Sequence, residues 1–192
     1  MTSSPEEPVL DVERILATLD RRHVDYLVVG GVSCRLQGAL RPTKDLDCLP
    51  DRSPDNLARL AAAMRELNAR LRVAGLTDAE ACRLPTQVDG MSLSQMELST
   101  WRTDAGDFDV LATMPDRHGA HLRYEDLVSR AITVDISGRP IRVAALADVI
   151  ASKEWADRPK DRQALPELRD LDRRARLTAD EVVIIARTDP SP

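Results

Sequence analysis

Residues 26–51 read YLVVGGVSCRLQGALRPTKDLDCLPD. This stretch predicts the central strand–helix–strand unit of the fold. The run Tyr26–Val29 predicts an internal strand, because it is short, apolar and closed by glycines. Gly30 and Gly31 end that strand, and a short helix is expected over about residues 32–39. A basic loop containing a glycine and a proline then leads into a second strand.

The second predicted strand carries two acidic residues, Asp45 and Asp47. Alternate side chains of a strand share a face, so these carboxylates project together while Leu46 points to the core. Carboxylates held side by side repel each other, and a bound divalent cation relieves the repulsion. An isolated Asp-x-Asp pair is usually an exposed loop feature. This pair follows a glycine turn inside an apolar strand, which predicts a site for Mg²⁺ or Mn²⁺.

The glycine pair offers a place for an anion. Free backbone N–H groups at the start of a helix bind phosphate, and the missing side chain of Gly31 permits close approach. Ser33 adds a hydroxyl at the same end, and Lys44 in the basic loop is a further candidate nucleotide contact. The alternative is that Gly30 and Gly31 form only a tight turn between strand and helix. Together, phosphate and metal sites predict an enzyme that acts on a nucleoside triphosphate (NTP).

A third carboxylate is expected on a neighbouring strand, predicted over residues 106–113. Asp107 and Asp109 share one face of it, and the choice between them stays open from sequence. We prefer Asp109 as a metal ligand, and as the group that orients or deprotonates the attacking hydroxyl, because the apolar Val110-Leu111 follows it directly. The alternative is an exposed edge strand.

Only three of the 27 basic residues are lysines: Lys44, Lys153 and Lys160. Lys153 falls on a predicted helix, where it is either an ordinary surface lysine or a point charge for the triphosphate. Asp161 opens the next helix, either as a catalytic carboxylate or as a partner of the helix dipole.

These residues carry a resemblance to a known family. Gly-Gly-Val-Ser followed by G-x-x-R-x-T-x-D-L-D resembles the signature of DNA polymerase β-like nucleotidyltransferases. The run LADVIASKEWADRPKDRQALPELRDL, residues 146–171, resembles the Lys and Asp motifs of one branch, the AbiEii/MenT-type toxins of bacterial toxin–antitoxin pairs. The resemblance implies triphosphate binding by Gly30, Gly31 and Ser33, metal binding by Asp45 and Asp47, and catalytic roles for Lys153 and Asp161.

The resemblance also implies a function. The protein would transfer a nucleoside monophosphate (NMP) to a tRNA 3′ end, inhibit growth, and have a cognate antitoxin as partner. Phosphorylation of Ser33 would be one means of control, since it would occupy the triphosphate site. Two alternatives stay open: transfer to a protein or small-molecule hydroxyl, such as an aminoglycoside, or an inert nucleotide-binding module.

The whole chain sets further bounds. At 192 residues it can form one core, and we expect an α/β or α+β fold with a nucleotidyltransferase core over residues 1–144 and a helical C-terminal part over residues 145–192. A net charge of −5 argues against bulk nucleic-acid binding, although residues 153–176 hold eight basic and six acidic residues. This run is either a solvated helix face or a contact for an RNA backbone.

Three scattered cysteines, no secretion signal and no apolar run near 20 residues predict a cytoplasmic protein with no membrane association. The remaining elements are predicted from periodicity and from turn residues. The expected helices cover residues 9–22, 53–71, 77–82, 124–130, 145–156 and 160–176, with Pro166 splitting the last and Thr178 capping a further segment. The expected strands cover residues 92–101, 132–136 and 140–143.

Overall fold

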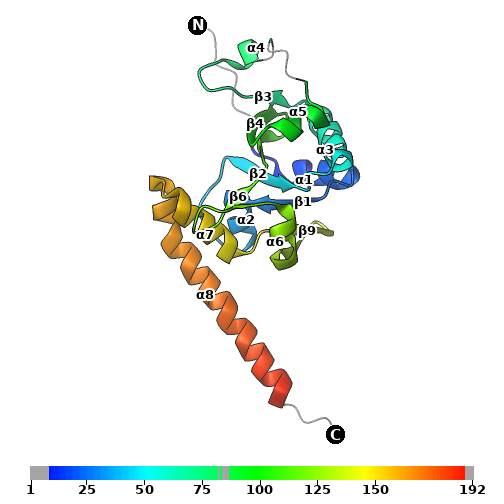
Figure 1. Ribbon diagram of the computed structural model, residues 1–192. Coiled ribbons are helices and arrows are strands. Elements are labelled where there is room, and N and C mark those ends of the chain that lie inside the picture. Colours follow the sequence, from blue (N-terminus) through cyan, green and yellow to red (C-terminus); the bar gives the residue numbers. More distant parts are fainter. Residues whose placement is uncertain (1–8, 82, 84–86, 189–192) are drawn as a thin grey trace.

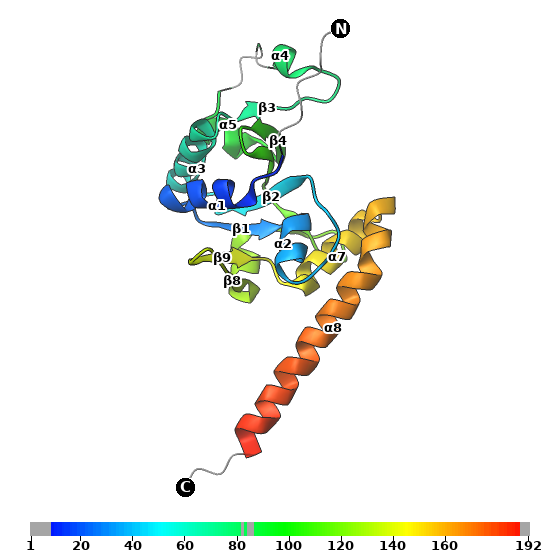
Figure 2. The ribbon, with the colours of Figure 1, turned by 180° about the vertical axis from the view of Figure 1, so that it is seen from behind.

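The computed structural model describes residues 9–81, 83 and 87–188. Within them, a seven-stranded mixed sheet has the strand order β3-β4-β5-β2-β1-β9-β8, and helices cover both of its faces (Figures 1 and 2). The predicted α/β class is confirmed.

The elements in chain order are α1 (Val12–Arg21), β1 (Tyr26–Val29), α2 (Gly30–Leu36), β2 (Asp45–Pro50), α3 (Pro54–Glu66), β3 (Arg70–Leu71), α4 (Asp78–Ala81), α5 (Gly90–Gln95), β4 (Leu98–Thr103), β5 (Gly106–Leu111), β6 (Met114–Pro115), β7 (His121–Leu122), α6 (Tyr124–Leu127), η1 (Val128–Arg130), β8 (Ile132–Ile136), β9 (Arg139–Val143), α7 (Leu146–Ala156) and α8 (Pro159–Thr188).

The centre of the sheet is formed by β5, β2 and β1. Strand β2 is antiparallel to β1 and parallel to β5, and β1 is parallel to β9. Toward the two edges of the sheet, the pairs β3–β4, β4–β5 and β8–β9 are antiparallel. Strand β2 therefore has a neighbour on each side, which fixes the orientation of its side chains.

Two apolar clusters lie on opposite faces of the sheet. The first joins α1 and α3 to the sheet and includes Leu46, Cys48 and Phe108. The second joins α7 and the start of α8 to the sheet and includes Leu49. Because Leu46 and Cys48 face the first cluster, the alternating residues of β2 face the side of α7. The expected burial of Cys34 and Cys48 is confirmed, and Cys82 lies outside the described residues.

The strand expected over residues 92–101 is wrong in its first half, where helix α5 forms instead. The side chain of Asp89 accepts a hydrogen bond from the backbone N–H of Ser92 at 2.7 Å and caps this helix. Gly90 lies against the backbone of α3, where a Cβ atom would be 3.1 Å from the nitrogen of Ala58. Close helix packing thus overrides the strand pattern. Helix α3 also ends at Glu66, earlier than expected, and the short strands β3, β6 and β7 escape prediction.

Helix α8 continues through both residues that were expected to interrupt it. Pro166 is exposed, whereas Leu165 before it and Leu168 after it are buried in the second cluster, so the helix is held on both sides of the proline. Thr178 caps nothing, because its hydroxyl donates to the carbonyl of Arg174 within the same helix. The C-terminal half of α8 extends away from the sheet (Figures 1 and 2). None of the helices that the structure describes combines the length and apolarity needed to cross a bilayer.

Asn56 ties the outer ends of β1 and β2 to α3. Its side chain is buried, accepts from the N–H of Asp25 and donates to the carbonyls of Asp25 and Asp51, each at 2.8 Å. We expect Asn56→Ala to lower the free energy of unfolding by about 2 to 3 kcal/mol, because buried backbone groups lose their partners. Urea denaturation measures this loss. The control Asp55→Asn, on the same turn, should change it by less than about 0.5 kcal/mol; equal losses would refute the bridging role.

Candidate active site

Four carboxylates share one face of two adjacent strands. In the parallel register of β2 and β5, Asp45 lies opposite Asp107 and Asp47 lies opposite Asp109. Between them Leu46 lies opposite Phe108, and both of these side chains are 0% exposed on the other face. The predicted acidic cluster of β2 and β5 is therefore assembled by strand pairing.

The carboxylates of Asp47 and Asp109 resist ionisation. Burial raises the pKa of Asp47 to about 7, assisted by the negative charges of Asp45 and Asp109 and opposed by the backbone N–H of Gly31 and by Lys153. Burial also raises the pKa of Asp109 to about 6, again with Asp45 contributing. Negative charge thus exceeds what the surrounding groups of the chain neutralise.

Asp107 and Asp109 differ in their partners. Asp107 is paired with the guanidinium of Arg72, Nη1–Oδ2 2.6 Å, and with that of Arg102, Nε–Oδ1 2.9 Å. Asp109 has a buried Oδ1 atom that receives no hydrogen bond from the described residues, although the hydroxyl of Thr100 on β4 contacts its carboxylate and lowers its pKa. A buried oxygen without a partner is costly, and a cation would satisfy it.

The two glycines are required by what lies against them. Gly30 has φ +63°, and a Cβ atom there would fall 1.9 Å from Oδ2 of Asp47. At Gly31 a Cβ atom would fall 2.5 Å from Oγ1 of Thr43, whose hydroxyl lies 3.0 Å from Oδ1 of Asp45. The start of α2 thus adjoins the acidic pair, and the bare backbone allows both to approach.

Ser33 lies elsewhere than its predicted role requires. Its side chain is 0% exposed, and its hydroxyl donates to the carbonyl of Ala144 at 3.0 Å and accepts from Nε2 of Gln37 at 3.1 Å. The hydroxyl therefore joins α2 to the connection between β9 and α7 instead of facing a phosphate. A modifying enzyme would have to expose this residue first.

Lys153 reaches the site from α7 and is held by a buried carboxylate. Its Nζ lies 2.9 Å from Oδ1 of Asp161, and Arg158 Nε lies 2.5 Å from Oδ2 of the same group. Burial of Asp161 opposes its ionisation, but the hydrogen bonds from Arg158 and Lys153 outweigh this and lower its pKa. With both oxygens engaged, Asp161 positions Lys153, which lies close enough to lower the pKa of Asp47.

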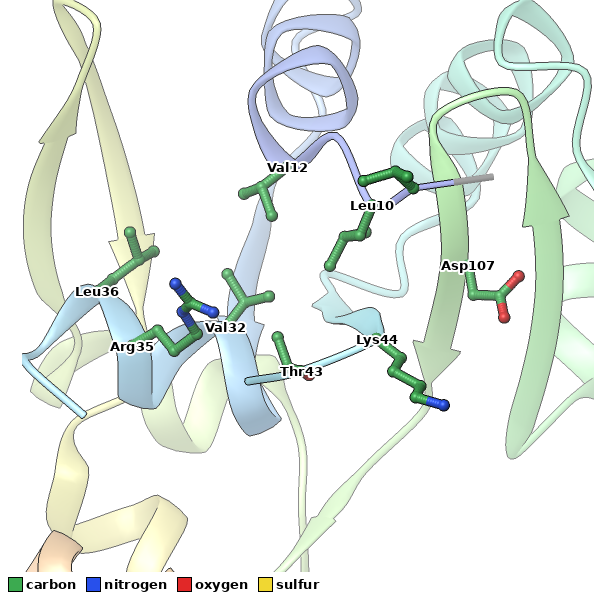
Figure 3. A pocket seen from close by; sticks show the side chains of 9 residues that line it. Leu10, Val12, Val32, Arg35, Leu36, Thr43, Lys44 and Asp107 are labelled. Atoms are coloured by element: carbon green, nitrogen blue, oxygen red, sulfur yellow. The ribbon is translucent and has the colours of Figure 1, made fainter. Parts of the chain in front are cut away.

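Lys44 follows Thr43 at the edge of the site and shares a hollow with Asp107. It is exposed and lines this hollow on the opposite side of Thr43 (Figure 3). The sequence reasoning assigned no role to Thr43 or to Thr100. Only Thr43 had a local signal, two residues before Asp45 on the same extended stretch. Thr100 had none, because the pairing of β4 with β5 brings it opposite Asp109.

The site fits a divalent cation that is completed by its substrate. No group of three or more His, Cys, Asp or Glu side chains in the described part of the chain is arranged to hold a metal alone. Mg²⁺ is commonly bound by one or two carboxylates together with water and substrate phosphates, so such a cage is not needed. The unpartnered Asp109 oxygen and the raised pKa values of Asp47 and Asp109 support this fit.

The fold is that of nucleotidyltransferases. The chain resembles the lincomycin-bound crystal structure of the lincosamide antibiotic adenylyltransferase LnuA (TM-score 0.56, 13% identity, 85% of this chain and 99% of that chain). It also resembles ANT(2")-Ia in complex with adenylyl-2"-tobramycin (TM-score 0.52, 18% identity, 90% and 91%). The sequence matches no protein-family model and no curated protein. The superfamily-level resemblance is thus supported at the level of fold, and the toxin branch stays a prediction.

Gly30→Ala tests the fit between α2 and Asp47. The added methyl group must displace the carboxylate, and the positive φ is strained for alanine, so we expect a loss of about 1 to 3 kcal/mol and loss of stabilisation by Mg²⁺. Gly75→Ala is the matched control, because Gly75 also has positive φ (+85°) but nothing lies within 4 Å of its Cβ position. Melting curves with and without Mg²⁺ measure both effects. Retained stabilisation by Mg²⁺ in Gly30→Ala would contradict this geometry.

The metal-free protein should lose stability as the pH rises from about 4 to 7. Asp47 and Asp109 have folded pKa values of about 7 and 6 against an ordinary aspartate pKa of 3.8, so the folded state binds more protons than the unfolded state in this window. Thermal melts in a chelator should show the decline, and millimolar Mg²⁺ should reverse part of it at about pH 8. Asp47→Asn should flatten the profile. The same pH dependence in Asp47→Asn as in the wild type would show that the Asp47 carboxylate is not strained.

Proposed function

We propose that this protein is a metal-dependent nucleotidyltransferase that moves NMP from an NTP to a hydroxyl acceptor. One observation carries the proposal: Asp45, Asp47 and Asp109 converge beside the bare backbone of Gly30, with more negative charge than the chain neutralises. Bound Mg²⁺ or Mn²⁺ would neutralise the triphosphate and polarise the reacting oxygens.

Each part of the transfer reaction is assigned to a particular residue of the site. The acceptor oxygen attacks the α-phosphorus, the bond from that phosphorus to the bridging oxygen breaks, and pyrophosphate leaves with the bonding electrons. Asp109, whose pKa is raised to about 6, accepts the hydroxyl proton. Lys153 and the backbone N–H groups of Gly30 and Gly31 bind the triphosphate, and Asp161 keeps Lys153 in position. The N–H of Gly31, which contacts the Asp47 carboxylate in the free protein, would exchange that contact for a phosphate oxygen.

For the acceptor we propose a tRNA 3′ end, with growth inhibition as the outcome and an antitoxin as the natural partner. Support comes from the exposed arginines Arg173, Arg174 and Arg176 on the extended half of α8. They form surface ion pairs with Asp170 and Asp172, which are weak enough to be exchanged for an RNA backbone. The second candidate is a small-molecule hydroxyl, favoured by the fold shared with two enzymes whose bound compounds are antibiotics or their adenylylated product.

Label transfer decides between these acceptors. The purified protein is incubated with Mg²⁺ and each of the four α-labelled NTPs, together with total tRNA, tobramycin, lincomycin or no added acceptor. We expect label on tRNA. Label on an antibiotic would establish the second candidate, label on the protein itself would indicate a protein acceptor, and no transfer from any NTP would refute the proposed activity. Growth arrest on induced expression, absent in Asp45→Asn/Asp47→Asn, would test the toxin role.

A matched pair of variants tests the third carboxylate. Asp109→Asn should lower the transfer rate by on the order of 100-fold or more, because it removes a charge at the reacting centre. Asp107→Asn, which removes the same charge two residues away but from a group already paired with Arg72 and Arg102, should cost less than about tenfold. The reverse ranking would move the catalytic role to Asp107.

A further inference from the structure

A hollow of about 560 Å³ opens between the start of α1, helix α2 and the segment that enters β2 (Figure 3). Its apolar wall is formed by Leu10, Val12, Val32 and Leu36. The volume falls within the range of small-molecule sites, about 300 to 1,000 Å³. None of its lining residues is aromatic, so it offers no stacking surface for a flat base.

Two cations in the lining of this hollow, Arg35 and Lys44, stand out from the other basic residues. Arg35 and Lys44 have no ion-pair or hydrogen-bond partner among the residues that the structure describes, although many of the other arginines are paired. Asp107 also lines the hollow, but its carboxylate is bound to Arg72 and Arg102. An apolar wall with two uncompensated positive charges favours a ligand that is apolar at one end and anionic at the other.

The hollow lies beside the carboxylate site, and Asp107 of β5 lines it. Thr43 packs against the backbone of Gly31 and forms the wall between the two, with its hydroxyl on Asp45. Lys153 approaches the carboxylates from α7, which packs in the second apolar cluster, whereas Val32 of the hollow belongs to the first. A ligand in the hollow would therefore contact Thr43 and approach the carboxylate face at Asp107.

We propose that this hollow binds an amphipathic organic anion, with a compact apolar body against Leu10, Val12, Val32 and Leu36 and a carboxylate or phosphate on Arg35 and Lys44. The binding free energy comes from burial of the apolar body, and the two cations select the sign of the charge. Binding in the hollow does not depend on the transfer reaction, so failure of one leaves the other standing.

Fluorescence of 1-anilinonaphthalene-8-sulfonate, an apolar body with a sulfonate, reports occupancy of the full-length protein. We expect its displacement by decanoate and by decyl phosphate but not by decyltrimethylammonium, which has a similar tail and the opposite charge. Tighter binding of decyl phosphate than of decanoate would identify a phosphate ligand, and the reverse a carboxylate. Equal displacement by the cation, or no fluorescence increase with folded protein, would overturn the proposal.

Variants locate the binding. Arg35→Gln/Lys44→Gln should weaken both anions by roughly tenfold, the loss of charge-assisted hydrogen bonds. Arg117→Gln/Lys160→Gln removes the same two charge types from exposed positions elsewhere and should leave affinity within about twofold. Circular dichroism melts confirm folding of each. Unchanged affinity in the first double variant would place the anion elsewhere and refute the site.

One competing occupant is the chain itself. The sequence places Glu6 and Glu7 just before Val9, which lines the hollow. A protein lacking residues 2–8 should bind the anions with unchanged affinity if the hollow serves an external ligand. An increase of tenfold or more would show that the N-terminal segment fills it, and would replace the external ligand in the proposal.

Discussion

The in-register parallel pairing of β2 with β5 is the constraint on which the site depends. It places Leu46 against Phe108 on one face and the carboxylates of both strands on the other. A shift of one residue would turn the carboxylates of β2 into the apolar cluster and expose Leu46. Burial of the apolar face therefore holds the acidic face together against its own repulsion. Packing of the core thus holds the carboxylates close together although they repel each other, and the pKa values of Asp47 and Asp109 are raised as a result.

Positive charge is supplied by another part of the chain. Lys153 approaches Asp47 from α7, and it is held there by Asp161, the fully buried residue in the first turn of α8. A buried carboxylate is tolerated when both oxygens are paired, and Arg158 completes this arrangement. The lysine is thus fixed in place instead of moving freely as a surface side chain would, which reduces the entropy lost when an anion binds it.

The local part of the site could be predicted from sequence because its signals are local. The strand, the glycine pair and the Asp-x-Asp spacing fall within 22 residues, and alternation along one strand fixes the shared face of Asp45 and Asp47. The choice between Asp107 and Asp109 could not be made from sequence. It depends on Arg102 of β4 and on Arg72, which directly follows β3, because both pair with Asp107. The inward turn of Ser33 and the anchoring role of Asp161 likewise arise from contacts with Ala144 and Lys153, which only the folded chain brings close.

Helix α8 also holds the loop that leads into the strand with Asp45 and Asp47. The backbone N–H of Leu40 donates to Glu167 at 2.7 Å, and Arg41 Nη2 donates to the carbonyl of Gln163 at 2.7 Å. The loop that delivers Thr43 and Asp45 is therefore fastened to the same helix whose first turn fastens Lys153. The loop before Asp45 and the side chain of Lys153 are both anchored to α8. A displacement of α8 would therefore move the carboxylates and the lysine together. The extended half of α8 is free of the sheet (Figure 2), and any partner that binds it acts on a helix whose other half sets this geometry.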